Sequence, residues 1–454
     1  PGALPLFGHL LALGDFPCKV LLNWKQKYGP VYRVKFGSFR TVVLNDTKSV
    51  KEAFRLAAFS DRPPLKQYKD GTEDKGFVYV DYDKSEQKFF IIKNLKAFSE
   101  NGQYLEGRLN EEISSFFDAF IPGKPIPIRN AFSHTVLNSI WGIVMGYTFK
   151  SGDPQMKTLC ELVQRVTAIP GMVESIGMFN PWLSNLMPDL TGVTSWCKAY
   201  RSLCHFVEGK ANERKLTRMK GDPRDMTDAF IDRMEDTKDP ASTFFPASVY
   251  LFFVSNVDLS LPKESLDTTS TTLEWVILFL AKYQDIQKKL QEEILEVVSK
   301  TRLPALSDRR NMPYTEAVIN EVLRITGLVP ISLPHYTNVD AEVSGYFIPK
   351  DTLVIQNTWG IQHDPEVWDE PEEFRPERFL DERGRFQKNE NLVIFGPGKR
   401  SCLGESIARD QLFLFVARMF QRFSVQYSGK PPSEHGKYGI VIHVNPFSAI
   451  FTEN

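Results

Sequence analysis

Apolar and polar residues alternate near both ends of the chain and recur at helical spacing between them. Residues 31–46, VYRVKFGSFRTVVLND, alternate around a Gly-Ser turn, which predicts a β-hairpin. A short helix is expected over 49–57. From about residue 84 to 300, apolar residues lie three and four positions apart, which predicts helices. Residues 270–298 contain no proline or glycine, so a long helix is expected there.

Strand patterns return in the last third of the chain. In chain order, the remaining predictions are helices over 133–147 and 313–325, a hairpin over 342–357, a helix over 403–423 and a β pair over 438–451. No internal repeat, low-complexity linker or domain boundary is visible. The predicted fold is therefore mainly α (α+β), with one large helical domain over residues 1–454 and small β-sheets at both ends.

Composition excludes several classes of protein. The chain has 454 residues and a formal net charge of -1, so no overall field favours nucleic acid or an anionic membrane. Its longest apolar run, at 275–281, is far shorter than the roughly 18 residues of a membrane span. Five cysteines without a CxxC pair disfavour a disulfide framework and a structural zinc site, and favour a reducing compartment. The opening PGALPLFGHLLALG is interpreted as the remainder of a longer chain whose upstream segment was removed.

One loop, FGPGKRSCLG at 395–404, has the features of a thiolate ligand site. Cys402 precedes a predicted helix, whose backbone N–H groups and dipole favour the thiolate. Arg400 can reach an anionic group, and Phe395 can limit access of water to the sulfur. The glycines permit unusual backbone conformations and close approach of a flat cofactor: Gly396, Gly398 and Gly404.

The spacing of this loop, F-x-x-G-x-R-x-C-x-G, resembles the heme-binding signature of the cytochrome P-450 family. Its specified positions are Phe395, Gly398, Arg400, Cys402 and Gly404. The resemblance implies heme b as the cofactor, with Cys402 as the axial ligand to the iron. It extends over nearly the whole chain and is nearest in character to the animal microsomal branch.

Three charged residues match structural elements of the same family. Glu321 and Arg324 lie three apart on an otherwise apolar predicted helix, so they can form a buried pair. A buried pair needs further partners to offset desolvation, and Arg378 is a candidate. Glu321-x-x-Arg324 and Pro376-Glu377-Arg378-Phe379 resemble the family's ExxR and PERF elements. The implied role is to fix the core around the cysteine loop.

The segment VPISLPHYT, 329–337, corresponds to the family's segment along the heme edge. The resemblance implies substrate-pocket positions there: Val329, Ile331, Ser332 and Leu333. His335 falls where the family often has a residue that binds a heme propionate; a purely structural role is the alternative.

The predicted helix near residues 86–99 departs from the family pattern. Near 86–99, Lys84 stands in the place of the family's tryptophan and Lys88 in that of its arginine. Lys88 can pair with a propionate only as a point charge. Heme retention is therefore expected to be weaker and to rely on Arg400, His335 and Arg62.

The oxygen-activating motif matches the family only in its second half. Asp267 and Thr268 occupy the acid and alcohol places and are the expected proton-relay pair. Pro262 is expected to break the helix before them, because proline in a helix interior removes a hydrogen bond. Residues 256–265 are interpreted either as a gene-model or splice artefact or as a real insertion that impairs oxygen activation.

The resemblance implies a monooxygenase that inserts one atom of O2 into a lipophilic substrate. No GxGxxG fingerprint is present, so electrons would come from a separate NADPH-dependent reductase, with cytochrome b5 as a second donor. Docking cations would include Lys399, Arg409 and Arg418, unless these are ordinary surface. We expect a monomer on the cytosolic face of the endoplasmic reticulum, held by a removed anchor, with the mitochondrion as the alternative.

Other functions remain open at this stage. A heme protein without turnover, a heme-thiolate isomerase or peroxide-dependent enzyme, and a scaffold without heme share parts of the pattern. The apolar segment 160–190 fits a substrate entrance, a membrane-facing surface or core packing.

Overall fold

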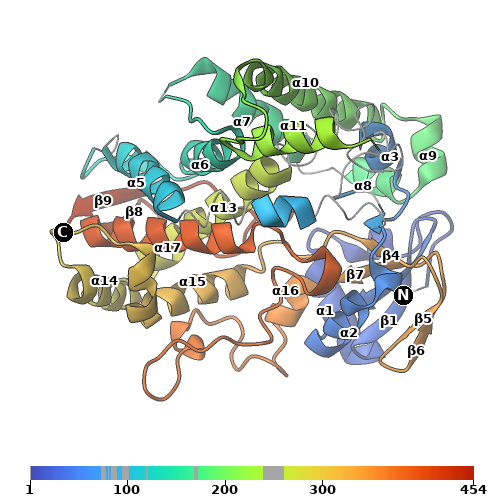
Figure 1. Ribbon diagram of the computed structural model, residues 1–454. Coiled ribbons are helices and arrows are strands. Elements are labelled where there is room, and N and C mark those ends of the chain that lie inside the picture. Colours follow the sequence, from blue (N-terminus) through green and yellow to red (C-terminus); the bar gives the residue numbers. More distant parts are fainter. Residues whose placement is uncertain are drawn as a thin grey trace.

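The structure is a computed structural model (Figure 1). It describes residues 2–72, 78–79, 81–82, 89–94, 102–118, 121–150, 152–167, 172–238 and 260–454. At 102–105, 108, 167, 172–174 and 260–267 it describes the backbone course only. Within these residues, helices form the body and three small sheets lie around it (Figure 1). The predicted mainly α fold with small sheets is confirmed.

The first sheet joins a hairpin near the start of the chain to two strands from its last third. Its strands are ordered β1 (Val31–Phe36), β2 (Phe39–Leu44), β7 (Leu353–Gln356) and β4 (His335–Tyr336). The predicted hairpin over 31–46 is present as β1 and β2. Strand β7 pairs with β2 in parallel, across about 300 residues of sequence.

Apolar residues of this sheet are buried on both faces, while Arg33, Lys35 and Arg40 are exposed on one face of the β1–β2 hairpin. One face packs on helix α1 (Pro17–Tyr28) and on η1 (Leu10–Leu13). The other face packs on α2 (Thr47–Arg55) and on a hairpin of β5 (Ala341–Val343) and β6 (Tyr346–Ile348). The hairpin expected over 342–357 is therefore shorter, because residues 353–356 pair with β2 instead.

The second sheet is built from distant segments in the order β3, β9, β8. Strand β8 (Phe423–Ser428) follows the last helix directly, β9 (Ser448–Glu453) ends the chain and β3 is Pro125–Pro127. The predicted β pair over 438–451 is wrong, since β9 takes β8 and β3 as partners rather than residues 438–443.

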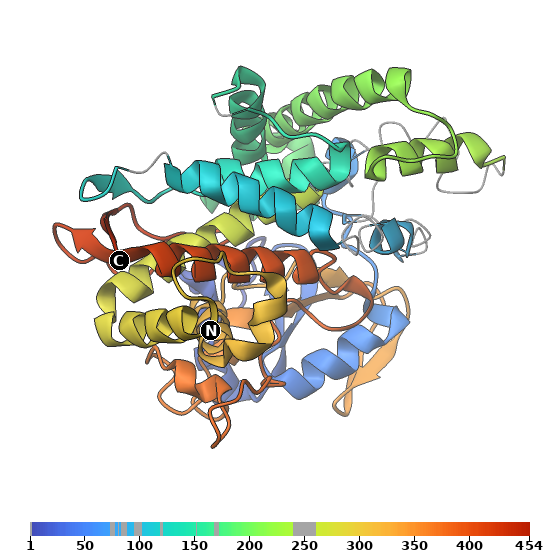
Figure 2. The same cartoon turned by 60° about the vertical axis from the view of Figure 1, so that its left-hand side comes forward.

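The helical body has one continuous apolar core. Its helices are α3 (Lys66–Thr72), α5 (Gly102–Asp118), α6 (Ser133–Met145), α7 (Pro154–Thr167), α8 (Met172–Met178), α9 (Pro181–Leu186), α10 (Val193–Thr217), α11 (Met226–Asp236), α13 (Ser260–Lys282), α14 (Gln284–Val298), α15 (Pro313–Thr326), α16 (Thr358–Gln362) and α17 (Glu405–Arg422). Short 3-10 turns are η2 (Ala57–Phe59), η4 (Leu306–Asn311), η5 (Pro376–Phe379) and η6 (Gly398–Arg400). Helix α17 crosses the molecule between α5 and α6 on one side and α14 and α15 on the other (Figures 1 and 2).

The long helix expected over 270–298 is two helices, α13 and α14, separated at Tyr283. After the break, the amides of Gln284 and Gln287 donate to the carbonyl of Val425, at 3.0 and 2.9 Å. The tertiary contact with β8 therefore overrides a local sequence that favours continuous helix.

The predicted break at Pro262 is also wrong. Helix α13 begins at Ser260, so Pro262 is its third residue. The first four N–H groups of a helix have no partner within it, so proline there costs no intrahelical hydrogen bond. The motif at 266–275 lies in unbroken helix. Residues 256–259 lie outside the described part of the chain.

Among the described residues, no helix combines the length and apolarity that a membrane span requires.

Candidate active site

The Cys402 loop is held by backbone contacts on both sides. The N–H of Cys402 donates to the carbonyl of Phe395 at 2.8 Å, which closes the loop. Gly398 has φ +78°, and a Cβ there would lie 1.9 Å from the carbonyl oxygen of Phe54 on α2. This glycine is therefore required by the approach of α2, whereas we expected the loop's glycines to serve the cofactor. Among the residues that the structure describes, a Cβ at Gly404 would meet nothing within 4 Å, so this position leaves space beside the cysteine.

Cys402 lies two residues before Gly404 and differs from the other cysteines in its exposure. Its side chain is exposed, while the other four cysteines are buried or half-buried. Helix α17 begins at Glu405, two residues later than expected, with Gly404 as its N-cap. The sulfur still lies near the positive end of a helix dipole, which stabilises a thiolate.

Phe395, the first residue of the loop, packs against a cation. The guanidinium of Arg409 lies 4.8 Å from the centre of the Phe395 ring. Arg409 also donates to Glu405 at 2.9 Å and to Asn320 at 3.1 Å. The ring is therefore positioned by α17 and α15 together.

Two arginines and a histidine converge next to the loop, from three separate segments. Arg400 Nε donates to the carbonyl of Ser60 at 2.7 Å. Arg62 is buried and donates to the carbonyls of Pro334 at 2.8 Å and Val78 at 2.7 Å. His335 is buried, and its Nδ1 lies 2.7 Å from the carbonyl oxygen of Phe59. We call Arg62, Arg400 and His335 the cationic cluster.

The electrostatics of the cationic cluster favour an anion. Burial, and then the charge of Arg62, lowers the pKa of Arg400 to about 9, against the opposing charges of Asp61 and Asp81. Burial and Arg62 also lower the pKa of His335 well below its ordinary value. An anion placed between these groups would offset both effects, because an opposite charge favours the protonated form.

These observations together test whether the site fits a heme. An exposed thiol at a helix start, open space at Gly404 and a cationic cluster beside them match the iron ligand, the flat face and the acidic edge of a heme. The residues present therefore fit the group.

A buried charged triad lies behind the loop. Glu321 and Arg324 are fully buried and joined by two hydrogen bonds of 2.7 and 2.8 Å. Arg378 Nε lies 3.3 Å from Glu321. We call Glu321, Arg324 and Arg378 the buried triad.

Backbone groups satisfy the rest of the buried triad. Arg324 donates to the carbonyls of Gln362, Pro371 and Glu373, at 2.8, 2.9 and 3.2 Å. The backbone N–H of Arg375 donates to Glu321 at 2.9 Å. Sequence reasoning missed these partners. The only available signal was that a buried guanidinium carries five donors and one carboxylate cannot satisfy them all.

Helix α13, which contains the expected oxygen-activating motif, carries a run of hydroxyl residues. Thr268 is half-buried, and its carbonyl accepts from the hydroxyl of Thr272 at 2.7 Å. Residues Thr269–Thr272 are buried. The side chain of Asp267 lies outside the described side chains, and Lys84 and Lys88 lie outside the described residues.

The expected pocket segment crosses from the sheet to the helical core. Ile331 contacts the apolar core of the helical body and also the apolar cluster between the first sheet and α1. The hydroxyl of Ser332 accepts from the backbone N–H of Gln356 at 3.0 Å, which ties this segment to β7. Val329 and Leu333 are half-buried, and the carbonyl of Leu333 accepts from Arg62 at 3.2 Å.

The expected docking cations differ in accessibility. Arg418 is buried and donates to Asn110 and Ser114 on α5, so its role as an exposed docking cation is wrong. Arg409 is largely covered by the contacts described above. Lys399 is half-buried and lies 4.9 Å from the ring centre of Tyr82.

Comparison with known proteins agrees with this geometry. The family model described as cytochrome P450 matches residues 1–451. The chain is 34% identical to "Vitamin D(3) 25-hydroxylase" of Sus scrofa, over 98% of this chain and 91% of the relative. It is 31% identical to "Farnesoate epoxidase" of Bombyx mori, over 99% and 92%, and 34% identical to "Cytochrome P450 2D14" of Bos taurus, over 98% and 91%. The chain therefore belongs to the cytochrome P450 family and is a heme-thiolate monooxygenase, which uses heme b, O2 and a partner reductase.

Proposed function

We propose that residues 1–454 form one heme domain that oxidises a lipophilic substrate at a heme held by the Cys402 thiolate. Heme, when bound, supplies the oxygen-activating chemistry. The observation that carries the proposal is the exposed thiol of Cys402 beside the cationic cluster. The residues of this chain bind and orient the heme, shield the sulfur and deliver protons.

At the acidic edge of the heme, Arg400, Arg62 and His335 bind the propionates, with Lys88 as a further point charge. The neutral His335 donates from Nδ1 to a carbonyl, so its Nε2 accepts a proton when a carboxylate is adjacent. Phe395 shields the sulfur. Gly404 keeps the cofactor face open, and Gly398 holds the loop against α2.

On the distal side, Asp267 and Thr268 hold and deliver protons. The unbroken course of α13 supports this role, because the two residues keep their helical spacing. It also weakens the rival interpretation of a heme protein that cannot turn over, which rested on a broken helix.

The substrate class is lipophilic, and a steroid, a fatty acid or a foreign compound would all qualify. Two relatives are named for vitamin D(3) and farnesoate. Substrate would contact Val329, Ile331 and Leu333, while Ser332 supports the segment through its bond to β7. Apolar pocket walls with few polar groups are typical of such sites.

The electron donor is an NADPH-dependent reductase, with cytochrome b5 as a second donor, and the enzyme acts as a monomer. Similarity to microsomal relatives indicates association with the endoplasmic reticulum, and we place the enzyme on its cytosolic face, held by an upstream anchor. Exposed apolar side chains in and after α9 support contact with the membrane: Trp182, Leu186, Met187 and Leu190.

A spectroscopic experiment tests the proposal. The reduced protein is exposed to carbon monoxide, the Soret band is recorded, and NADPH consumption is followed with a reductase present. We expect a thiolate-type band that is lost in Cys402→Ala and kept in the matched control Cys160→Ala. A retained band in Cys402→Ala would exclude the thiolate assignment.

The distal role has its own test. Thr268→Val should keep the thiolate band but reduce product formed per NADPH consumed by about 10-fold or more, within the range of general acid–base effects. Unchanged coupling in Thr268→Val would remove Thr268 from the proton path.

A further inference from the structure

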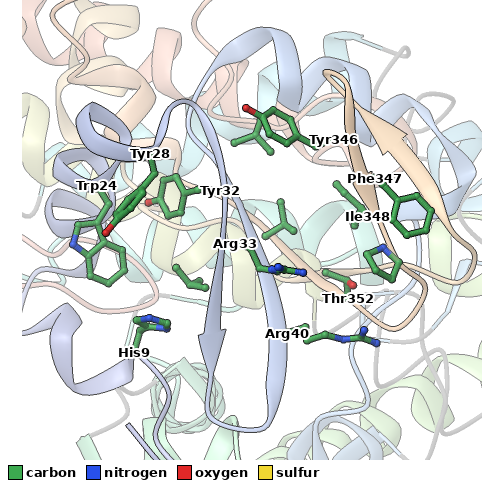
Figure 3. Close-up of a pocket in the computed structure, with 14 residues that line it drawn as sticks. His9, Trp24, Tyr28, Tyr32, Arg33, Arg40, Tyr346, Phe347, Ile348 and Thr352 are labelled. Carbon is green, nitrogen blue, oxygen red and sulfur yellow. The ribbon is translucent and has the colours of Figure 1, made fainter. Parts of the chain in front are cut away.

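A cavity outside the heme site lies beside the first sheet (Figure 3). We call it the second cavity, and we call the first sheet with α1, α2 and the β5–β6 hairpin the N-terminal lobe. Its volume is about 560 Å³, and its walls come from α1, the β1–β2 hairpin, β6 and the residues that follow β6. No residue of the Cys402 loop, of α13 or of the cationic cluster lines it. The cavity passes around β1, the edge strand of the first sheet.

One wall of this cavity is apolar. Ile348 of β6 is buried in the same cluster as Val42 of β2 and Val31 of β1, so the two hairpins pack together at its floor. Tyr346 and Phe347 stand at the rim with 50% and 68% of their surface exposed. Such a wall can cover an aromatic or aliphatic ligand body.

The other wall is cationic. Arg33 and Arg40 line the cavity, and Figure 3 shows their guanidinium groups extending from the hairpin on the side of Ile348 and Thr352. In the strand register, Arg40 lies directly opposite Lys35, and Arg33 lies diagonal to it. All three side chains therefore project from one face of the β1–β2 hairpin.

These cations repel one another, and Arg40 donates to the backbone carbonyl of Lys350 at 3.4 Å rather than to a carboxylate. Like charges directly opposite on neighbouring strands are destabilising. Among the described residues, no carboxylate forms an ion pair with Arg33, Lys35 or Arg40, and no carboxylate lines the cavity. Glu342, on the facing hairpin, is opposite Phe347 and does not line the cavity.

We propose that this groove is a second ligand site, which binds a small organic anion with an aromatic or apolar body. The acidic group, a carboxylate, sulfonate or phosphate, lies between Arg33 and Arg40, where planar guanidinium groups can bind it in bidentate fashion. The body packs on Ile348 and Phe347. The anion offsets the repulsion within the hairpin, so binding also stabilises the N-terminal lobe.

Two matched fluorescent probes test the site on the heme-loaded protein. 8-Anilinonaphthalene-1-sulfonate has the predicted chemistry, and N-phenyl-1-naphthylamine has the same aromatic body without the charge. We expect saturable binding of one equivalent of the sulfonate, weakened at least 10-fold in Arg33→Gln/Arg40→Gln. Binding of the neutral probe should be the same in both proteins.

A charge-matched control and a heme-site control complete the design. Arg383→Gln removes an exposed cation from a loop remote in sequence and should leave sulfonate binding unchanged. An azole that ligates the heme iron should also leave it unchanged. The proposal is overturned if the double variant binds the sulfonate like the parent, if Arg383→Gln weakens it equally, or if the azole displaces it.

Discussion

The buried triad and the cationic cluster are two groups of buried charge that the fold treats in opposite ways. In the buried triad, Glu321 meets Arg324 through two hydrogen bonds, and backbone carbonyls accept from the remaining donors of Arg324. In the cationic cluster, burial, and then the charge of Arg62, lowers the pKa of Arg400 to about 9, against the opposing charges of Asp61 and Asp81. The first group is complete within the chain, whereas the second favours an added anion.

This difference separates a structural site from a binding site. A charge network that is satisfied internally gains nothing from a ligand, and removing one member leaves another buried and unpaired. A buried cation whose pKa is lowered by burial and by a second cation is stabilised by an anionic ligand. The buried triad therefore fixes the frame, and the cationic cluster receives the cofactor.

The largest effect is expected from breaking the buried triad. Glu321→Gln keeps the shape but leaves the buried charge of Arg324 without its carboxylate, which should lower the free energy of unfolding by about 3–5 kcal/mol. Denaturant unfolding of the variant and parent measures this loss. A loss below about 1 kcal/mol would show that the frame does not depend on the pair.

A smaller, differently directed effect is expected from the cationic cluster. Arg400→Gln should weaken heme binding about 10-fold, equivalent to about 1.4 kcal/mol, because a charge at the acidic edge is lost. The heme-free protein should unfold no more easily, since one of two repelling buried charges is gone. Heme transfer to an acceptor protein and unfolding of the heme-free protein measure the two quantities. Equal destabilisation with and without heme would contradict the comparison.

His335 within the cationic cluster and His363 near the buried triad are both buried, which predicts a pH dependence. Burial, and then the charge of Arg324, lowers the pKa of His363 to about 3, while burial and Arg62 lower that of His335. In the heme-free protein, folded and unfolded states both hold these rings neutral above about pH 6.5. Below it, only the unfolded state gains the protons, so the free energy of unfolding falls by about 1.4 kcal/mol per pH unit for each ring.

A single substitution isolates one of these contributions. His363 stacks on Trp359 with ring centres 3.8 Å apart, so His363→Phe keeps the stacking. Its pH slope between pH 6 and pH 4 should be smaller by about 1.4 kcal/mol per pH unit. An unchanged slope, measured by denaturant unfolding across this range, would mean that His363 protonates in the folded state.

The smallest effect is expected at the exposed edge of the buried triad. The side chain of Arg375 pairs with Asp369 and Glu370 at 3.0 and 3.1 Å, but it is partly exposed. Arg375→Gln should change the free energy of unfolding by less than about 1 kcal/mol, because exposed ion pairs contribute little. Its backbone N–H still serves Glu321. A change approaching that of Glu321→Gln would extend the buried triad to this side chain.

Local sequence was enough to predict the elements whose determining residues lie close together in the chain. The cysteine loop, the hairpin at β1 and β2 and helix α15 each carry their signal within about fifteen residues. The pairing of Glu321 with Arg324 follows from helical spacing alone. Pro262 was misinterpreted for a local reason: a proline has opposite meanings in the first turn and in the interior of a helix, and the starting residue was not visible in the pattern.

Other features could not be predicted because they depend on contacts between distant segments. Arg418 has the sequence of an exposed cation on α17, yet α5 covers it. The break at Tyr283 depends on β8, and the second cavity combines α1 with residues near 350. The requirement for glycine at Gly398 comes from Phe54, more than 340 residues earlier.

The parallel pairing of β2 with β7 has a consequence for synthesis of the chain. Thr41 pairs with Leu353, so the first sheet cannot close until residues near 356 have left the ribosome. At about 5–20 residues per second, this delay lasts roughly 15–60 s. During that time the apolar edge of β2 has no partner strand, and it is a ready target for association with other chains. The nascent N-terminal lobe is therefore expected to need a chaperone until the last quarter of the chain arrives.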